Sequence, residues 1–287
     1  MVPRGDPAPL RWLIGVELAR HRHAAKLSLT EASDHSGISR AKLGHLETGR
    51  QQQDPDDIIR LLKTYQVDQG DIDRLISLTS RADEATWWAP WAQVVPDWLK
   101  TFVGLEGLAE CEFVFEPLII PGLLQLEQYA AAVTANTPRV RADHSERFVG
   151  FRIARTRRLT DPERPLKVHA VLTEGALRLA VGSPQLRRTQ LQHLLALAAL
   201  PTVTIQVVRP EDGPHTALTG QFVLLGFESV RSIGYVELHD GALYLQDADQ
   251  VRTYNMVRKD LQRAALSPER SIALIQSMLG SHVGDSS

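Results

Sequence analysis

Helix start and stop signals alternate between residues 28 and 55, and they leave room only for short helices. The run Ser28-Leu29-Thr30-Glu31 matches the S-x-x-E capping box and opens a helix, which Gly37 ends because glycine reaches positive φ without steric penalty. Ser39 caps the next helix, Gly49 stops it, and Pro55 begins another. The pattern therefore predicts two short helices joined by a glycine turn, with a third helix after them.

The second of these helices, residues 39–48, has an apolar side and a polar side. Ile38, Leu43 and Leu46 fall on the side that we expect to be buried. Helix, glycine turn and helix over residues 28–48 fit the helix-turn-helix template, whose second helix lies in the DNA major groove. We expect base contacts from Arg40, Ala41, Lys42 and His45, and phosphate contacts from Thr30, Ser39, Arg50 and Gln51.

Lys42 adds an electrostatic argument for DNA binding. It lies three residues after the Ser39 cap, in the first turn of the helix, where the macrodipole favours an anion. Such a mismatch is expected if Lys42 meets phosphates or guanine rather than water. Residues 11–50 carry seven Arg or Lys against four acids, whereas residues 51–80 carry three against six. The alternative interpretation of this pattern is a helical bundle with a solvated basic face.

The remaining sequence predicts a multi-domain protein. Residues 10–81 are expected to form an all-α five-helix bundle that contains the helix-turn-helix. Residues 82–100 form a Trp-rich connector, and residues 101–280 alternate strand and helix patterns typical of an α+β domain. The expected strands cover residues 110–120, 166–172, 203–208, 220–227, 232–238 and 242–246. The expected helices cover residues 122–135, 144–159 and 183–200, with two more that begin at Asp247 and Ser267.

Composition excludes several classes of protein. The net charge of −2 over 287 residues means that any site for a polyanion must be local. No signal peptide and no run of 18 apolar residues is present, so we expect a soluble, cytoplasmic protein with no membrane contact. Cys111 is the single cysteine, which excludes an internal disulfide, and we expect it to be a buried small apolar residue. No catalytic set or metal-ligand spacing can be assembled, so we expect no enzyme activity, cofactor or metal.

Two further clusters leave alternatives open. The tryptophans Trp87, Trp88, Trp91 and Trp98 are interpreted as packing between domains, with an exposed partner groove as the alternative. Four arginines gather on one expected helix, and they are interpreted as a solvated helix face, with an accessory contact to DNA or an acidic partner as the alternative. These are Arg152, Arg155, Arg157 and Arg158.

The segment LSLTEASDHSGISRAKLGHLETGR resembles the Xre, or lambda-repressor-like, regulators, because it carries Leu-Ser, then Gly-Ile-Ser, then Leu-Glu and Gly-Arg in the family's register. The segments VPDWLKTFVGLE, VFEPLIIPGLLQLEQYA, HAVLTEGALR and ALSPERSIALI resemble, in the same order, an antitoxin-like subfamily of these regulators with a large C-terminal domain of unassigned chemistry. The resemblance implies transcriptional control and a small cognate partner protein.

Together these observations predict a sequence-specific DNA-binding transcriptional regulator. A single module of this kind binds DNA weakly, so we expect a homodimer on a palindromic operator in double-stranded DNA. The C-terminal domain would then serve sensing, dimerisation or partner binding. One alternative is an antitoxin-like adaptor that binds its small partner and has little role on DNA. The other is an enzyme in the C-terminal domain, which would need converging titratable groups.

Overall fold

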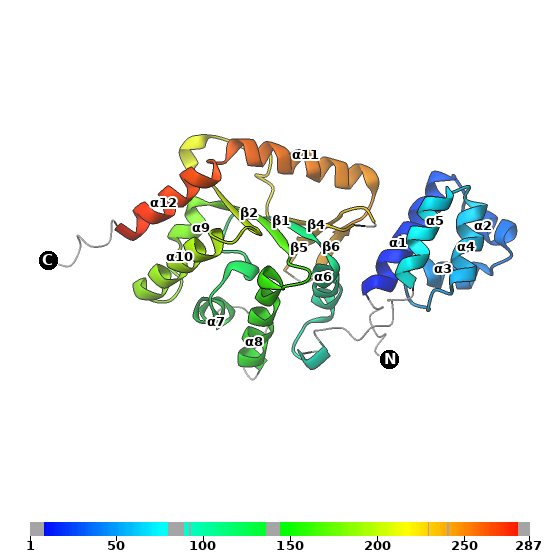
Figure 1. Cartoon of the computed structure of the whole chain (residues 1–287), viewed down its shortest axis with the longest axis horizontal. Coiled ribbons are helices and arrows are strands. Elements are labelled where there is room, and N and C mark those ends of the chain that lie inside the picture. Colours follow the sequence, from blue (N-terminus) through cyan, green and yellow to red (C-terminus); the bar gives the residue numbers. More distant parts are fainter. Residues whose placement is uncertain are drawn as a thin grey trace. The chain divides into compact units, whose positions relative to one another are not determined.

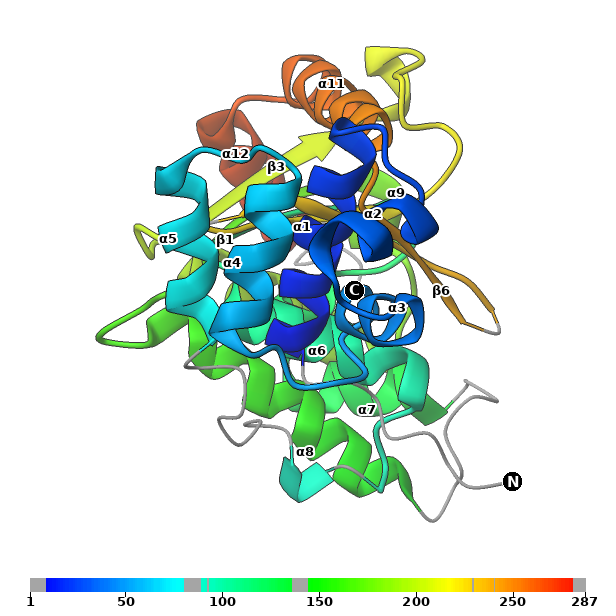
Figure 2. The same cartoon turned by 90° about the vertical axis from the view of Figure 1, so that its right-hand side faces the viewer.

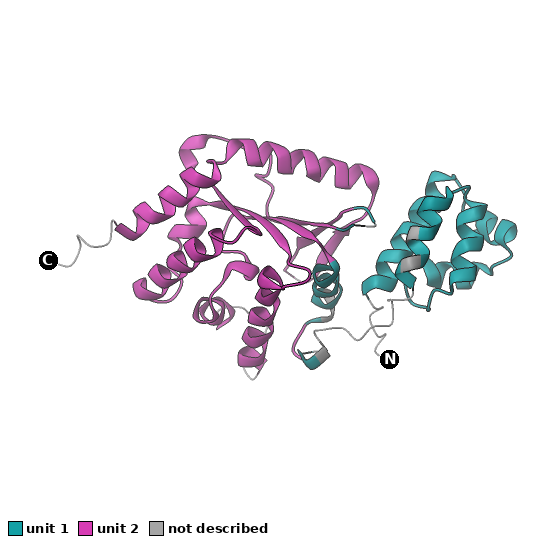
Figure 3. Ribbon diagram, in the orientation of Figure 1, with its two compact units in different colours: residues 1–92, 96–108, 227–231 teal, residues 93–95, 109–226, 232–287 magenta. Residues whose placement is uncertain are grey.

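The computed structural model describes residues 9–79, 89–91, 93–135, 144–228, 230–239 and 241–280. The chain divides into two compact units, one formed by residues 1–92, 96–108 and 227–231 and the other by the remaining residues (Figure 3). The first unit is helical and the second combines helices with a six-stranded sheet, which confirms the predicted fold class. The exact bounds of the domains and the connector stay predictions, and Trp87 and Trp88 lie outside the described residues.

The helical unit begins with five helices that follow one another closely (Figure 2). They are α1 (Pro9–Ala24), α2 (Leu29–Ser36), α3 (Arg40–Glu47), α4 (Pro55–Thr64) and α5 (Gln69–Thr79). After them come a single 3-10 turn, η1 (Ala89–Trp91), and α6 (Asp97–Leu108). Aliphatic side chains from α1, α3, α4 and α5 fill the core of this unit. Fully buried members include Ile14, Leu18, Leu43, Leu46, Ile58, Leu61, Leu62 and Leu75.

Local hydrogen bonds confirm the predicted helix ends. Ser28 Oγ accepts from the Glu31 amide at 3.2 Å while the Glu31 carboxylate accepts from the Ser28 amide at 2.8 Å, which completes the capping box. Gly37 ends α2 with φ 69°, and Ser39 Oγ accepts from an amide in the first turn of α3. Gly49 has φ 64° and donates to the Leu46 carbonyl of the last turn of α3, so it ends that helix in a left-handed conformation.

A close approach of two backbones fixes the end of α3 against α1. A Cβ atom on Gly15 would lie 2.4 Å from the Glu47 carbonyl oxygen, so no larger residue fits there without a shift of the backbone. On the other side of the contact, a Cβ atom on Gly49 would lie 2.7 Å from the Trp12 nitrogen. Two glycines therefore allow α1 and the end of α3 to lie in direct main-chain contact.

The second unit is built on one mixed sheet with strand order β3-β2-β1-β4-β5-β6 (Figure 1). Its strands β1, β2 and β3 are parallel, whereas β4, β5 and β6 continue the sheet in antiparallel pairs. All six predicted strands are present. They are β1 (Cys111–Glu116), β2 (Lys167–Thr173), β3 (Val203–Val208), β4 (Phe222–Gly226), β5 (Ile233–Glu237) and β6 (Ala242–Leu245).

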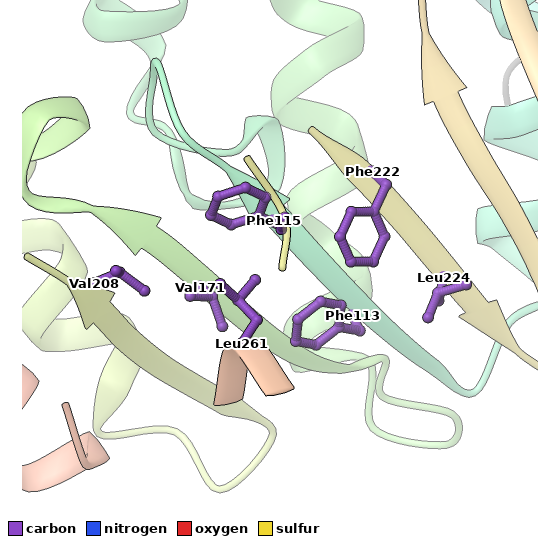
Figure 4. Packing of buried hydrophobic residues seen from close by; sticks show 8 residues of the cluster. Phe113, Phe115, Val171, Val208, Phe222, Leu224 and Leu261 are labelled. Carbon is purple, nitrogen blue, oxygen red and sulfur yellow. The ribbon is translucent and has the colours of Figure 1, made fainter. Parts of the chain in front are cut away.

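Helices cover both faces of this sheet (Figure 1). On one face, α11 (Ala248–Ala264) packs through Leu261 onto aromatic residues of β1 and β4, chiefly Phe113, Phe115 and Phe222 (Figure 4). On the other face lie α7 (Glu127–Ala135), α8 (Ser145–Thr156) and α10 (Pro184–Ala198). The short helix α9 (Glu174–Arg178) follows β2, α12 (Pro268–Gly280) packs against β3, and single 3-10 turns cover Gly122–Leu124, Arg157–Thr160 and Pro210–Asp212.

The structure contradicts the expected start of one helix in this unit and the expected burial of Cys111. The helix predicted over residues 122–135 begins only at Glu127, because Gln125 is extended and the Gln190 side chain bonds both the Leu124 carbonyl and the Leu126 amide at 2.8 Å. Tertiary hydrogen bonds thus replace the helical ones. Cys111 is exposed rather than buried, because it is the first residue of β1 and lies beside the exposed Lys167 at the end of the sheet.

Candidate nucleic-acid interface

The polar side of α3 presents most of the predicted base-contacting residues to solvent. Arg40 and Ala41 are exposed in its first turn, and His45 is exposed one turn later. On the opposite side Leu43 and Leu46 have no exposed surface and anchor the helix in the core. The sequence therefore folds into a short helix whose outward side chains are free to meet another surface.

The predicted phosphate-contacting residues surround this helix. Ser39, Arg50 and Gln51 are exposed at its two ends, and Thr30 is exposed in the first turn of α2. Ser39 Oγ already accepts from the Lys42 amide at 3.3 Å, which leaves its hydroxyl proton available to donate to a phosphate. All four residues are exposed, and their roles as phosphate contacts stay predictions.

Lys42 differs from the other predicted base contacts. Its Nζ lies 2.5 Å from Oδ2 of Asp57 on α4, and its side chain is 38% exposed. The cation in the first turn of α3 therefore has an anion within the protein. The electrostatic argument that Lys42 needs DNA to satisfy it no longer holds, although a base contact by Lys42 stays a prediction.

A buried ion pair holds the other end of α3. The Arg22 guanidinium on α1 donates to both carboxylate oxygens of Glu47, at 2.7 and 2.9 Å, and each side chain is 8% exposed. The hydrogen bond to Glu47 raises the pKa of Arg22 above its ordinary value, so the guanidinium stays charged. The buried Gln53 amide group also donates to the Leu46 carbonyl and to the Arg11 carbonyl, at 2.8 Å each. These bonds attach the end of α3 to α1.

Sequence reasoning missed these supporting residues. Arg22 and Glu47 are separated by 25 positions, and neither belongs to a local motif. Asp57 is one of the acidic residues in the first turn of α4, where a negative charge is favourable, and nothing in its local sequence points to Lys42. The one sequence signal for such a partner was Lys42 itself, because a cation in the first turn of α3 is unfavourable unless an anion lies beside it.

The arginine cluster is not the solvated helix face that the sequence predicts, since Arg152 and Arg155 lie on α8 whereas Arg157 and Arg158 lie in the 3-10 turn after it. Arg155 is buried, Arg152 and Arg158 are half-buried, and only Arg157 is exposed. Arg152 donates to Gln125 Oε1 at 3.2 Å, and Arg158 donates to the Ala109 carbonyl at 2.8 Å. Arg152 and Arg158 therefore bond to other segments of this unit instead of facing only solvent. The contact to DNA or to an acidic partner stays open only for Arg157.

Glu116, the last residue of β1, lies in this same polar region. Burial raises the pKa of its carboxyl group to about 8, and the charge of Glu237 at the end of β5 contributes in the same direction. Burial also lowers the pKa of Arg152 to about 10.

Within the described part of the chain, no group of His, Cys, Asp and Glu side chains could hold a metal ion. Among the same residues, no helix is long and apolar enough to cross a membrane.

Exposed leucines gather at one edge of the sheet. The parallel strands β1, β2 and β3 all end at this edge, and β5 ends there too because it is antiparallel to β4. The segments that follow these ends expose Leu118, Leu179, Leu218 and Leu238 by 70, 44, 69 and 40%. Thr173 Oγ1 donates to the Pro117 carbonyl at 2.6 Å, which connects the ends of β2 and β1. Apolar exposure of this kind is a feature of binding surfaces.

Comparison with known protein families gives one matching family model for each of the two units. A family model described as a helix-turn-helix domain matches residues 13–75, which include α2, the glycine turn and α3. A second model, described as a domain of unknown function (DUF5753), matches residues 99–277 and covers the whole sheet. No curated protein and no solved structure matches the chain.

Proposed function

Because the chain belongs to the DUF5753 family and carries a helix-turn-helix domain at its N-terminal side, we propose that it is a sequence-specific DNA-binding transcriptional regulator. In this proposal α3 lies in the major groove and reads bases through Arg40, Ala41 and His45. The observation that carries it is the two-sided burial of α3, with Leu43 and Leu46 fully buried and the three reading residues exposed. A helix that enters the major groove needs one side packed against the protein and the other side exposed to contact DNA.

The finer parts of the proposal follow from this placement. Ser39, Thr30, Arg50 and Gln51 would hold phosphates on either side of the inserted helix. A homodimer would place two copies of α3 in successive major grooves of a palindromic operator. We further propose that the chain is an antitoxin-like member of the Xre regulators that acts in the cytoplasm. The proposal assigns no enzyme activity, cofactor or metal to it.

Arg40→Ala is expected to weaken operator binding by about 1–3 kcal/mol, because an arginine that bonds guanine loses both of its hydrogen bonds. The operator is first selected from a random pool of duplexes with the full chain, and gel-shift titrations then compare the variants at one salt concentration. Arg252→Ala on α11 removes the same charge from an exposed position and is the control. Equal affinities of the wild type and the Arg40→Ala variant would contradict base reading by α3.

A second candidate function is an antitoxin-like adaptor that binds a small cognate protein through the DUF5753 domain. The exposed leucines at the carboxyl edge of the sheet favour it, because four of them lie on segments that follow strand ends at this same edge. This function and DNA binding use different units, so one chain could perform both.

Leu118→Ser with Leu218→Ser is expected to abolish capture of the cognate protein, because both side chains are more than two-thirds exposed and contribute apolar contact area. The measurement is co-purification of the small protein encoded beside the regulator, followed by a titration of the purified pair. Met256→Ser removes an apolar side chain of 56% exposure from α11 and should leave capture unchanged. Unaltered capture by the double variant would exclude this edge as the binding surface.

A further inference from the structure

We propose that Asp57 is a positioning residue of the DNA-binding unit, which binds the ammonium group of Lys42 and thereby keeps this cation from neutralising a DNA phosphate. The inference rests on the proposed function of α3 and assigns a role to a residue outside the helix-turn-helix itself. It also changes the role of Lys42, from a reader of bases to part of the support of α3.

The contact that carries the inference is short and partly shielded from water. Lys42 Nζ lies 2.5 Å from Asp57 Oδ2, and the side chain of Asp57 is only 11% exposed. An exposed pair of this kind would contribute little, because water screens both charges. Burial of the carboxylate makes its attraction for the ammonium group stronger and makes the loss of its partner unfavourable.

The two helix N-termini explain why this pair forms. Asp57 lies in the first turn of α4, after the cap Asp54 and Pro55, where a negative charge is favourable. Lys42 lies in the first turn of α3, where a positive charge is unfavourable. A single carboxylate therefore stabilises the start of α4 and compensates the cation at the start of α3.

The pair also completes the attachment of α3. Its C-terminal end is attached to α1 through Arg22 and Glu47, and α3 otherwise packs mainly against α1 and α2. The bond from Lys42 to Asp57 adds a connection to α4 at the opposite end of the helix. Both ends are then fixed, which sets the direction in which Arg40 and His45 point.

The consequence for DNA binding can be measured as the dependence of DNA affinity on salt concentration. Each phosphate that a protein cation neutralises makes log K fall by about 0.9 per tenfold rise in salt concentration. A Lys42 that is bound to Asp57 contributes little to this slope. Asp57→Asn removes the carboxylate charge at nearly constant volume and should release Lys42 to contact a phosphate.

The test compares the wild-type full chain, the Asp57→Asn variant and the Lys42→Met/Asp57→Asn double variant. Binding to a random-sequence duplex is followed by fluorescence anisotropy between 50 and 200 mM salt, a range over which phosphate contacts are well resolved. For Asp57→Asn we expect a slope steeper by about 0.9 and an affinity about eightfold higher at 100 mM salt. The double variant should return to the wild-type slope. A slope that stays unchanged in Asp57→Asn, or a double variant shallower than the wild type by about 0.9, would overturn the inference.

A measurement without DNA separates the inference from the proposed function. Melting temperatures of the wild type, Lys42→Met, Asp57→Asn and the double variant form a double-mutant cycle for the pair. The double variant should lose less than the sum of the two single losses. Additive losses would mean that Lys42 and Asp57 do not interact, which would overturn the inference. If the losses are coupled but the protein binds no DNA at low salt, the proposed function of α3 is rejected, and the pair only stabilises the helix.

Discussion

Arg22→Met is expected to lower the free energy of unfolding of the helical unit by about 3–5 kcal/mol, because it leaves Glu47 as a buried charge without its partner. The Arg22 guanidinium makes two bonds to that carboxylate and a third, at 2.8 Å, to the Leu27 carbonyl. Burial and the charge of Glu47 also raise the pKa of the neighbouring Tyr65, so a negative charge at this place is already unfavourable without the guanidinium. Methionine retains most of the side-chain volume, so the loss is electrostatic rather than steric.

Urea unfolding followed by far-ultraviolet circular dichroism measures this effect. Arg60→Met removes an arginine from an exposed position on α4 and should change stability by no more than about 0.5 kcal/mol. The double variant Arg22→Met/Glu47→Leu removes both buried charges and should recover much of the loss. A double variant less stable than Arg22→Met alone would show that the volume of these side chains, rather than the unpaired charge, decides stability.

The parts of the fold that the sequence predicts are those that depend on neighbouring residues. The capping box at Ser28, the turn at Gly37 and the cap at Ser39 each involve residues no more than a few positions apart, and all three are present. The six strands are also correct, since their β-branched and aromatic runs reflect burial in a sheet. Residue type and spacing are enough to predict caps, turns and strands, because these depend on residues only a few positions apart.

The parts that sequence reasoning could not predict depend on residues far apart along the chain. Gly15 carries no turn or cap, and its role is visible only when Glu47 lies against it. Gln190 interrupts the helix predicted over residues 122–135 from a position more than sixty residues away. In both cases the deciding contact is a tertiary one, which overrides the local helical pattern.

The charged side chains also divide into what the local sequence predicts and what only contacts between distant residues decide. The mismatch of Lys42 with the dipole of α3 is real, but Asp57 compensates it within the protein. Arg152 on α8 and Arg158 in the 3-10 turn after it belong to one run of arginines in the sequence, yet each donates to an acceptor on another segment. A run of basic residues therefore identifies where positive charge is placed in the sequence, and only the fold determines whether it meets solvent, DNA or the protein itself.

Phe115→Ala is expected to destabilise the sheet-containing unit by about 3–5 kcal/mol, because it opens a cavity on the central strand. Phe115 is 1% exposed and lies among Phe222, Val171 and Leu261, between the sheet and α11 (Figure 4). Its ring also meets His215 edge-on, at 5.4 Å between centroids, in the segment that exposes Leu218. The loss should therefore affect both the core and the exposed leucines at the carboxyl edge of the sheet.

Hydrogen exchange on the full chain measures where this loss occurs. Each compact unit has its own buried core, so amide protection should fall across β1, β2 and β4 and remain unchanged across α3. Leu243→Ala removes an apolar side chain that is 52% exposed on β6 and should change stability by no more than about 0.5 kcal/mol. Equal loss of protection in α3 and in β1 would mean that the two cores unfold as one, and the exposed leucines at the carboxyl edge of the sheet and α3 could then not be altered independently.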